Sequence, residues 1–464
     1  MTTTLRRSGT LRAAAAAVLV GLATTSLAWW RLGPVTRGTA WAEDGGVFLR
    51  ERLALGPVDS LLHPYAGYLH LVPRLLVDAA WALPVEEYAR ALSAAACLVV
   101  GAVALTVFLL ARDVVPQWPL RALLAAVPAL LPLAPHEISG NVANLHWFLL
   151  FACPWLFAHR ARSWWASGVV AVLTGFVVLT ELQTVLFLPM LLLAWFPLRD
   201  ASGVRAWPRA VPVTLVALAG GAAQIVTAVT DQRSRAPEAT GFADVVAGWL
   251  LQPVAGIWSP DVGAVVRVVV THGWGVVLVP VLLVAAALVA AVVVGSWRAR
   301  WTVLVLAVAS GGVWWAALVA NAGEVQAWAH PTQGLAAVPP LRYAAASGLL
   351  LLAAAVVAAS VLLGPGRGAT DGAGDGARPA HGGPRSGGPA RSARALAGWC
   401  VVAVVVVATL GNVAPGPTRR SDGPVWATQV PAAIEACAGD PTRSVAIRKV
   451  PWSAQVPCAR LLEH

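Results

Sequence analysis

The sequence predicts an all-α bundle of membrane-spanning helices, and two observations carry this prediction. Hydrophobic residues make up 58% of the 464 positions and charged residues only 12%, with a mean hydropathy of +0.70. Soluble domains are about half apolar and about a quarter charged. The apolar residues also gather in runs of spanning length. A soluble enzyme and a nucleic-acid partner are therefore disfavoured, and the net charge of +11 is expected mainly in cytoplasmic loops.

About eleven spans are expected. The first covers 11–30, after a basic flank, and is interpreted as an uncleaved helix rather than a signal peptide. The others are expected at 89–111, 120–135, 144–158, 165–180, 182–198, 210–229, 274–296, 301–320, 342–363 and 396–413. Short loops on one side carry arginines, whereas the turns around 136–143 and 180–184 carry no Arg or Lys. This asymmetry predicts a multi-pass plasma-membrane protein with its N-terminus inside and its C-terminus outside.

The spans divide the chain into four parts. A helical bundle is expected over 1–363, and it includes a long outer loop at 31–88. Residues 364–394 are rich in Gly, Pro and Arg and are expected to form a flexible cytoplasmic linker. A last span at 395–413 then leads to a small outer tail at 414–464.

The first outer loop contains an acidic pair, Glu43-Asp44, followed by two glycines. Adjacent side chains point in different directions, so that one acid can face a cavity while the other anchors the loop. The alternative is a solvated turn. Further along the loop, Tyr65, Tyr68 and His70 suit a segment at the membrane interface. They are also candidates for binding a lipid headgroup or a sugar.

A second polar group lies on the outer side, between two apolar runs. If the segment is helical, Glu137, Asn141 and Asn144 share one face, which must point at water, a cavity or a partner. The alternative is hydrogen bonding between helices. With His136 and the hairpin residue Glu181, these are candidate substrate-binding residues, although a polar hairpin tip explains Glu181 equally well.

Arg342-Tyr343 stands where the last long outer loop enters a helix. An arginine on the outer side is unexpected for topology, and a guanidinium at the interface is well suited to bind a phosphate. The alternative is that Arg342 reaches the lipid headgroups.

Together these features resemble the GT-C class of polytopic glycosyltransferases, which use lipid-phosphate-linked sugars. The resemblance rests on a first helix followed by an outer loop with the acidic pair Glu43-Asp44, on the many-helix layout, and on Arg342-Tyr343 entering a late helix. It covers roughly 1–363 in layout. It implies transfer of a sugar from a polyprenyl-phosphate donor to a glycan or lipid acceptor of the cell envelope, as in actinobacterial members of the class.

Transferred to this sequence, the resemblance makes Glu43 or Asp44 the base that activates the acceptor hydroxyl, or else the ligand of a divalent cation. Arg342, with Tyr343 beside it, would contact the donor phosphate. The pair begins with Glu43, whereas the class commonly has an Asp-containing pair, so the choice of acid and the metal dependence stay open.

The alternative function is a non-catalytic scaffold or a transporter of lipid-linked glycans. A transporter more often carries ionisable residues at mid-span, and the spans here are nearly free of them. That pattern favours chemistry at one face of the membrane.

The outer tail contains Cys437 and Cys458. Two cysteines in an oxidising compartment, in a segment with little core of its own, are expected to form a disulfide. The tail's Trp426, Trp452, Val445 and Ile447 could form a small apolar cluster or dock on the helix bundle. The alternative is a frayed tail with two free thiols.

Overall fold

The computed structural model describes residues 2–198, 207–231, 240–321, 327–364 and 389–463, and these are mostly helical. Seven helices in these ranges are long and apolar enough to cross a membrane. They are α1 (Thr2–Arg37), α4 (Tyr88–Leu110), α10 (Val211–Thr230), α13 (Gly275–Val294), α14 (Trp297–Ala320), α15 (Arg342–Leu363) and α16 (Pro389–Leu410). The prediction of an all-α bundle with membrane-like helices is confirmed at this level.

The other four expected spans coincide with shorter helical segments. These are α5 (Trp118–Leu130), α7 (Leu145–Ala158), α8 (Trp164–Val178) and the pair formed by η4 (Leu182–Met190, a 3₁₀ helix) and α9 (Leu191–Trp195). A straight span needs about 20 residues, so the number of eleven membrane crossings stays a prediction.

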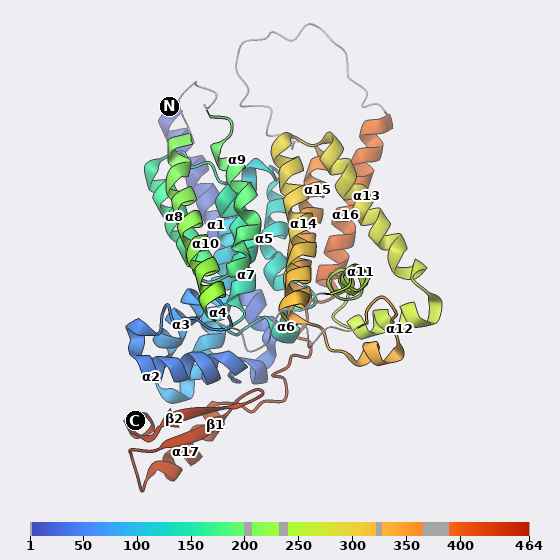
Figure 1. Cartoon of the computed structure of the whole chain (residues 1–464). Coiled ribbons are helices and arrows are strands. Elements are labelled where there is room, and N and C mark those ends of the chain that lie inside the picture. The colour runs from blue at the N-terminus through green and yellow to red at the C-terminus, as the bar shows by residue number, and fades with distance from the viewer. Residues whose placement is uncertain (1, 199–206, 232–239, 322–326, 365–388, 464) are drawn as a thin grey trace.

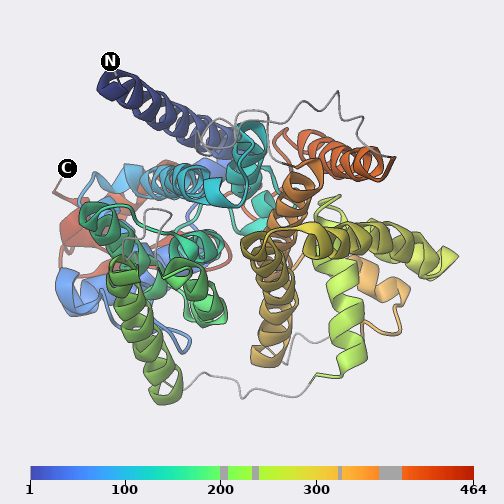
Figure 2. The same ribbon diagram turned by 90° about the horizontal axis from the view of Figure 1, so that it is seen from above.

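Helix α15 lies at the centre of the bundle. It contacts α5, α7, α13, α14 and α16, and 89% of its apolar window is buried, against 11% for α13. Its many alanines allow neighbouring helices to approach closely. Seen from above, α13–α16 gather on one side of the molecule and α7–α10 on the other (Figure 2).

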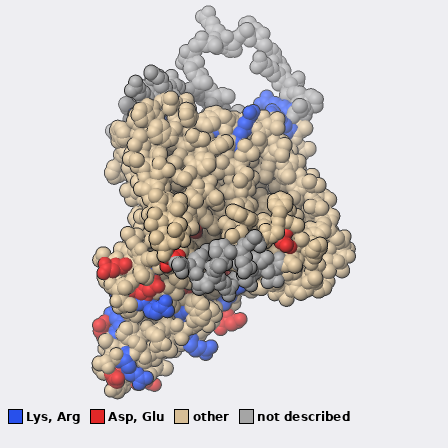
Figure 3. All heavy atoms as spheres, viewed as in Figure 1, with Lys and Arg blue, Asp and Glu red and all other residues tan. Residues whose placement is uncertain are grey.

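The two ends of the bundle differ. The N-terminus and the ends of α15 and α16 that flank residues 365–388 lie at the upper end, and the C-terminal residues lie at the lower end (Figure 1). On the face drawn in Figure 3, charged side chains are concentrated toward these ends, and a broad surface without Lys, Arg, Asp or Glu separates them. That distribution fits a bundle embedded in a bilayer.

The segment expected as a long loop, 31–88, is largely helical. Helix α1 continues to Arg37, and α2 (Leu49–Asp59) and α3 (Leu71–Trp81) form a layer beneath the bundle (Figure 1). The expected linker 364–394 lies outside the described residues apart from its two ends, because α16 begins at Pro389.

Short elements complete the described chain. They are η1 (Asp44–Phe48, a π-helical turn), η2 (Val85–Glu87), η3 (Ala111–Asp113), α6 (Ala134–Glu137), η5 (Trp207–Ala210), α11 (Phe242–Trp249), η6 (Leu250–Val254), α12 (Val262–His272), η8 (Gln333–Ala337) and η9 (Ala427–Gln429).

Residues 414–463 form a C-terminal unit beneath α2 and α3 (Figure 1). It contains α17 (Val430–Cys437), α18 (Cys458–Leu461) and an antiparallel hairpin in which β1 (Ser444–Arg448) pairs with β2 (Ser453–Pro457). The predicted disulfide between Cys437 and Cys458 is present, with a Cα–Cα distance of 5.3 Å. Trp426 and Ile447 are fully buried, whereas Trp452 is 51% exposed and does not join the apolar cluster.

Candidate functional site

The acidic pair lies in the turn that joins α1 to α2, and its two carboxylates occupy different environments. Asp44 is buried, and its carboxylate accepts hydrogen bonds from the backbone N–H groups of Val142 (3.1 Å) and Ala143 (2.8 Å). Burial raises the pKa of Asp44 to about 7, while these two bonds and the charge of Arg420 act in the opposite direction. Asp44 therefore fastens the turn to the segment before α7, outside the cavity described next.

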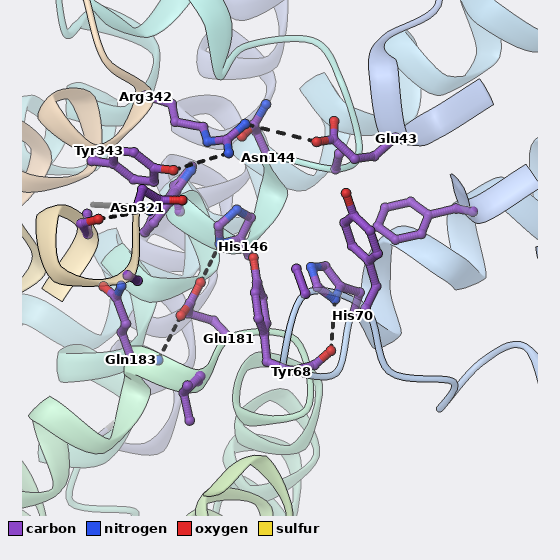
Figure 4. A pocket seen from close by; sticks show the side chains of 18 residues that line it. Glu43, Tyr68, His70, Asn144, His146, Glu181, Gln183, Asn321, Arg342 and Tyr343 are labelled. Carbon is purple, nitrogen blue, oxygen red and sulfur yellow. Dashed lines mark hydrogen bonds and ion pairs between the residues drawn. The ribbon is translucent and has the colours of Figure 1, made fainter. Parts of the chain in front are cut away.

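Glu43 faces a cavity of about 120 Å³ at the lower end of the bundle (Figure 4). Five chain segments supply its walls: the first loop, the start of α7, the turn before η4, the end of α14 and the start of α15. The lining residues are Glu43, Phe48, Tyr65, Ala66, Tyr68, His70, Ala143, Asn144, His146, Trp147, Glu181, Leu182, Gln183, Ala317, Ala320, Asn321, Arg342 and Tyr343. The cavity is smaller than a typical site for a drug-sized ligand, so it suits a reacting group rather than a whole lipid-linked molecule.

A cluster of opposite charges lies at one end of this cavity. The Arg342 guanidinium is 4.0 Å from Glu43 Oε1 and 3.5 Å from Glu137 Oε1, and it donates a hydrogen bond to the Tyr343 hydroxyl. Glu137 also pairs with Arg419 at 3.4 Å. Glu43 Oε2 is buried and has no hydrogen-bond partner among the described residues. The cluster thus combines a well-held cation with a carboxylate oxygen that can accept a proton or a hydrogen bond.

The opposite wall holds a histidine paired with a glutamate. His146 Nδ1 lies within hydrogen-bond distance of Glu181 Oε2, and Glu181 Oε1 accepts a hydrogen bond from the Gln183 N–H at 2.7 Å (Figure 4). Both members of the pair are buried. A carboxylate bound to one ring nitrogen fixes the orientation of an imidazole, so His146 presents a fixed ring to the cavity.

Aromatic side chains of the first loop form the floor. The rings of Tyr68 and His70 lie 4.0 Å apart, and Phe48 contacts both Tyr65 and His70. Burial, together with the charges of His146 and Arg74, holds the pKa of His70 well below its usual range. His70 is therefore expected to be neutral at pH 7 and able to hydrogen-bond a sugar hydroxyl.

The expectation of one polar helical face over Glu137, Asn141 and Asn144 is wrong. Helix α6 ends at Glu137, and Gly140 adopts a positive φ of 68° that breaks the helix. A Cβ at Gly140 would also collide with Leu32.

As a result these polar residues separate. Asn144 lines the cavity, whereas the Asn141 side chain accepts hydrogen bonds from Asn144 and donates to the Glu137 carbonyl oxygen. His136, Glu137 and Asn141 are not lining residues. Glu137 reaches the cavity through its ion pair with Arg342.

The structure thus brings to one cavity eight residues singled out from the sequence: Glu43, Tyr65, Tyr68, His70, Asn144, Glu181, Arg342 and Tyr343. Four other residues singled out from the sequence do not line the cavity: Asp44, His136, Glu137 and Asn141. Sequence reasoning missed His146, Gln183, Asn321 and Arg419. His146 and Gln183 each lie two residues after a residue that was singled out, Asn144 and Glu181. Their polar side chains at the edge of an apolar run are the signal that could have identified them.

A divalent cation would need ligands that the described residues supply only sparsely. No group of three or more His, Cys, Asp or Glu side chains in the described part of the chain is arranged to hold a metal ion. At the cavity Glu43 could offer one carboxylate, and oxygens of a substrate would have to complete the coordination.

Comparison of this chain with protein-family models, with curated proteins and with solved structures found no match.

Proposed function

We propose that this protein is a GT-C-like integral membrane glycosyltransferase. It transfers a sugar from a polyprenyl-phosphate donor to a glycan or lipid acceptor of the cell envelope. The supporting observation is that the carboxylate of Glu43 and the guanidinium of Arg342, which are remote in sequence, meet at one cavity at the end of an apolar bundle. The likeness to GT-C enzymes is one of layout and short motifs.

The proposed reaction needs a proton acceptor and a cation. The acceptor oxygen forms a bond to the anomeric carbon of the sugar while the bond from that carbon to the phosphate oxygen breaks. Glu43 takes the proton of the acceptor hydroxyl. The departing phosphate carries the electron pair away, and Arg342 stabilises its charge by bidentate hydrogen bonds.

The proposal includes an orientation in the plasma membrane. Basic loops favour a cytoplasmic upper end, so the cavity and the C-terminal unit would lie outside. The donor's lipid tail would stay in the bilayer beside the helices while its sugar reaches the cavity. Reporter fusions after residues 60 and 440 are expected to give an outside signal, and a fusion within 364–394 an inside signal; an outside signal there would contradict this topology.

Activity is tested with the purified protein in lipid nanodiscs. A panel of polyprenyl-phosphate-linked hexoses and pentoses is supplied with extracted envelope acceptors, and products are identified by mass spectrometry. Transfer by the wild-type protein and its loss in Glu43→Gln would support the proposal. Glu87→Gln is the matched control, because Glu87 is an exposed acid at the same end of the bundle. Donor binding without transfer in the wild-type protein would favour the scaffold or transporter instead.

A further inference from the structure

Lys449 is the only lysine among the 33 basic residues of the chain, and the C-terminal unit holds it in a buried position. It follows β1 directly, and the residue is 3% exposed. Its Nζ lies 4.6 Å from the centre of the Trp452 ring and has no hydrogen-bond partner among the described residues. An ammonium that is buried without a partner is costly, so its surroundings must supply compensating charge.

The Lys449 side chain lies directly against the acidic turn. A Cβ added at Gly45 would be 2.8 Å from Lys449 Cδ, and one added at Gly46 would be 2.8 Å from Nζ. The next residue, Val450, donates its N–H to the carbonyl oxygen of Ala40 at 3.2 Å. The two glycines after Glu43-Asp44 therefore leave the space that the lysine occupies.

Three charged groups act on this ammonium. Burial lowers the pKa of Lys449 to about 8; Glu43 opposes this most strongly, then Asp44, while Arg50 adds to the lowering. Glu43 Oε2 is itself buried without a hydrogen-bond partner. Because Lys449 is not a lining residue of the cavity, it can affect chemistry there only through the acidic turn.

We propose that Lys449 is a positioning residue of the site: the C-terminal unit supplies its ammonium to the turn, where it keeps the Glu43 side chain directed into the cavity. The compact charge of a lysine fits against Gly46, whereas the planar guanidinium of an arginine is wider. The catalytic consequence of this inference rests on the proposed transferase function, but the coupling between Lys449 and Glu43 does not.

The coupling is measured by NMR on the full chain in nanodiscs. Biosynthetic labelling with ¹³C-lysine gives one side-chain signal, because there is one lysine. In the wild-type protein this signal is expected to titrate near the lowered Lys449 pKa of about 8. In Glu43→Gln the midpoint is expected about one unit lower, because the protonated lysine loses a nearby negative charge. Glu87→Gln is expected to leave the midpoint unchanged. The same midpoint in Glu43→Gln as in the wild-type protein would overturn the inference.

The catalytic consequence is measured on Lys449→Met, which keeps an apolar chain of similar length. Its kcat is expected to fall by about 10- to 100-fold with KM within about twofold, as for other residues that orient a reacting group. Arg448→Met removes the exposed neighbouring charge and is expected to keep the wild-type kcat. An undiminished kcat in folded Lys449→Met would refute the positioning role. If the wild-type protein transfers no sugar, the proposed function fails, and the NMR titration alone decides the inference.

Discussion

The two faces of the turn that joins α1 to α2 differ in what they contact, although the acids on them, Glu43 and Asp44, are adjacent in sequence. On the cavity face, Glu43 lies near Arg342 and keeps one oxygen without a hydrogen-bond partner in the described structure. On the buried face, Asp44 accepts two backbone hydrogen bonds and is enclosed. The same chemical group thus lies where it can react on one face and where it can only hold structure on the other.

This difference teaches how the fold assigns roles within an acidic pair. A fully satisfied carboxylate contributes to stability, because its removal leaves buried donors unpaired. A carboxylate with a free oxygen at a cavity contributes little to stability and is available for chemistry. Substitutions on the cavity face should therefore change transfer, and substitutions on the buried face should change unfolding.

The largest expected effect is that of Glu43→Gln. Loss of a general base lowers rates by about 10²- to 10⁴-fold, so we expect kcat to fall by about 10³-fold in the nanodisc transfer assay. The thermal unfolding midpoint should stay close to that of the wild-type protein, because the pair with Arg342 is long at 4.0 Å. A large loss of stability with unchanged transfer would reverse the roles assigned to the two faces.

The second-largest effect is expected from the disulfide of the C-terminal unit (residues 414–463), which packs against the turn that contains Asp44. Replacing both Cys437 and Cys458 with Ala removes a disulfide that spans 21 residues, which by the chain-entropy model lowers the stability of the C-terminal unit by about 3 kcal/mol. Limited proteolysis should then cut within 414–463 at lower protease concentration. Cys400→Ala, which changes an exposed free cysteine outside that unit, is the control. Equal protease resistance in both variants would mean that packing on the turn, not the disulfide, holds the unit.

A smaller effect is expected for Asp44→Asn, and it depends on pH. The amide keeps one acceptor oxygen, so one backbone N–H is left unpaired at a cost of about 1–3 kcal/mol near neutral pH. Because burial raises the pKa of Asp44 from 3.8 to about 7, folding favours its protonated form. Ionising Asp44 costs more in the folded than in the unfolded state, so stability is highest below about pH 4 and falls as the pH rises through 7. Unfolding midpoints of the wild-type protein should fall across this range, and those of Asp44→Asn should fall less; identical slopes would contradict the assignment.

The buried and exposed sides of the bundle could be predicted only in part from the sequence. Hydropathy located α13 and α15 equally well, because both are long and strongly apolar. It could not show that α15 is enclosed and α13 is not, because burial depends on which helices become neighbours. The segment at 31–88 was predicted as a loop without its helices, since α2 and α3 are each 11 residues long and too short to be recognised as membrane spans.

The candidate site shows the same limit. Glu43 and Arg342 were singled out because charged residues at the end of an apolar span are conspicuous. Arg419 and Lys449 were not singled out, because they lie in the C-terminal unit, far from the site in sequence. Folding brings Arg419 to Glu137 and Lys449 to the acidic turn. The break at Gly140 was missed because a glycine in a polar segment is compatible with either a helix or a turn until its φ is known.

The smallest expected effect tests the buried face without altering any charge. The hydroxyl of Tyr88 donates a hydrogen bond to the backbone carbonyl oxygen of Asp44 at 2.8 Å, and the ring is fully buried. Tyr88→Phe keeps the packing of the ring and removes that bond, so we expect a loss of about 1 kcal/mol in the free energy of unfolding. Transfer should stay within about twofold of wild type, because the Glu43 carboxylate and Arg342 are untouched. If Tyr88→Phe instead lowers kcat as strongly as Glu43→Gln, the backbone of the turn sets the position of Glu43 directly, and the two faces act as one unit.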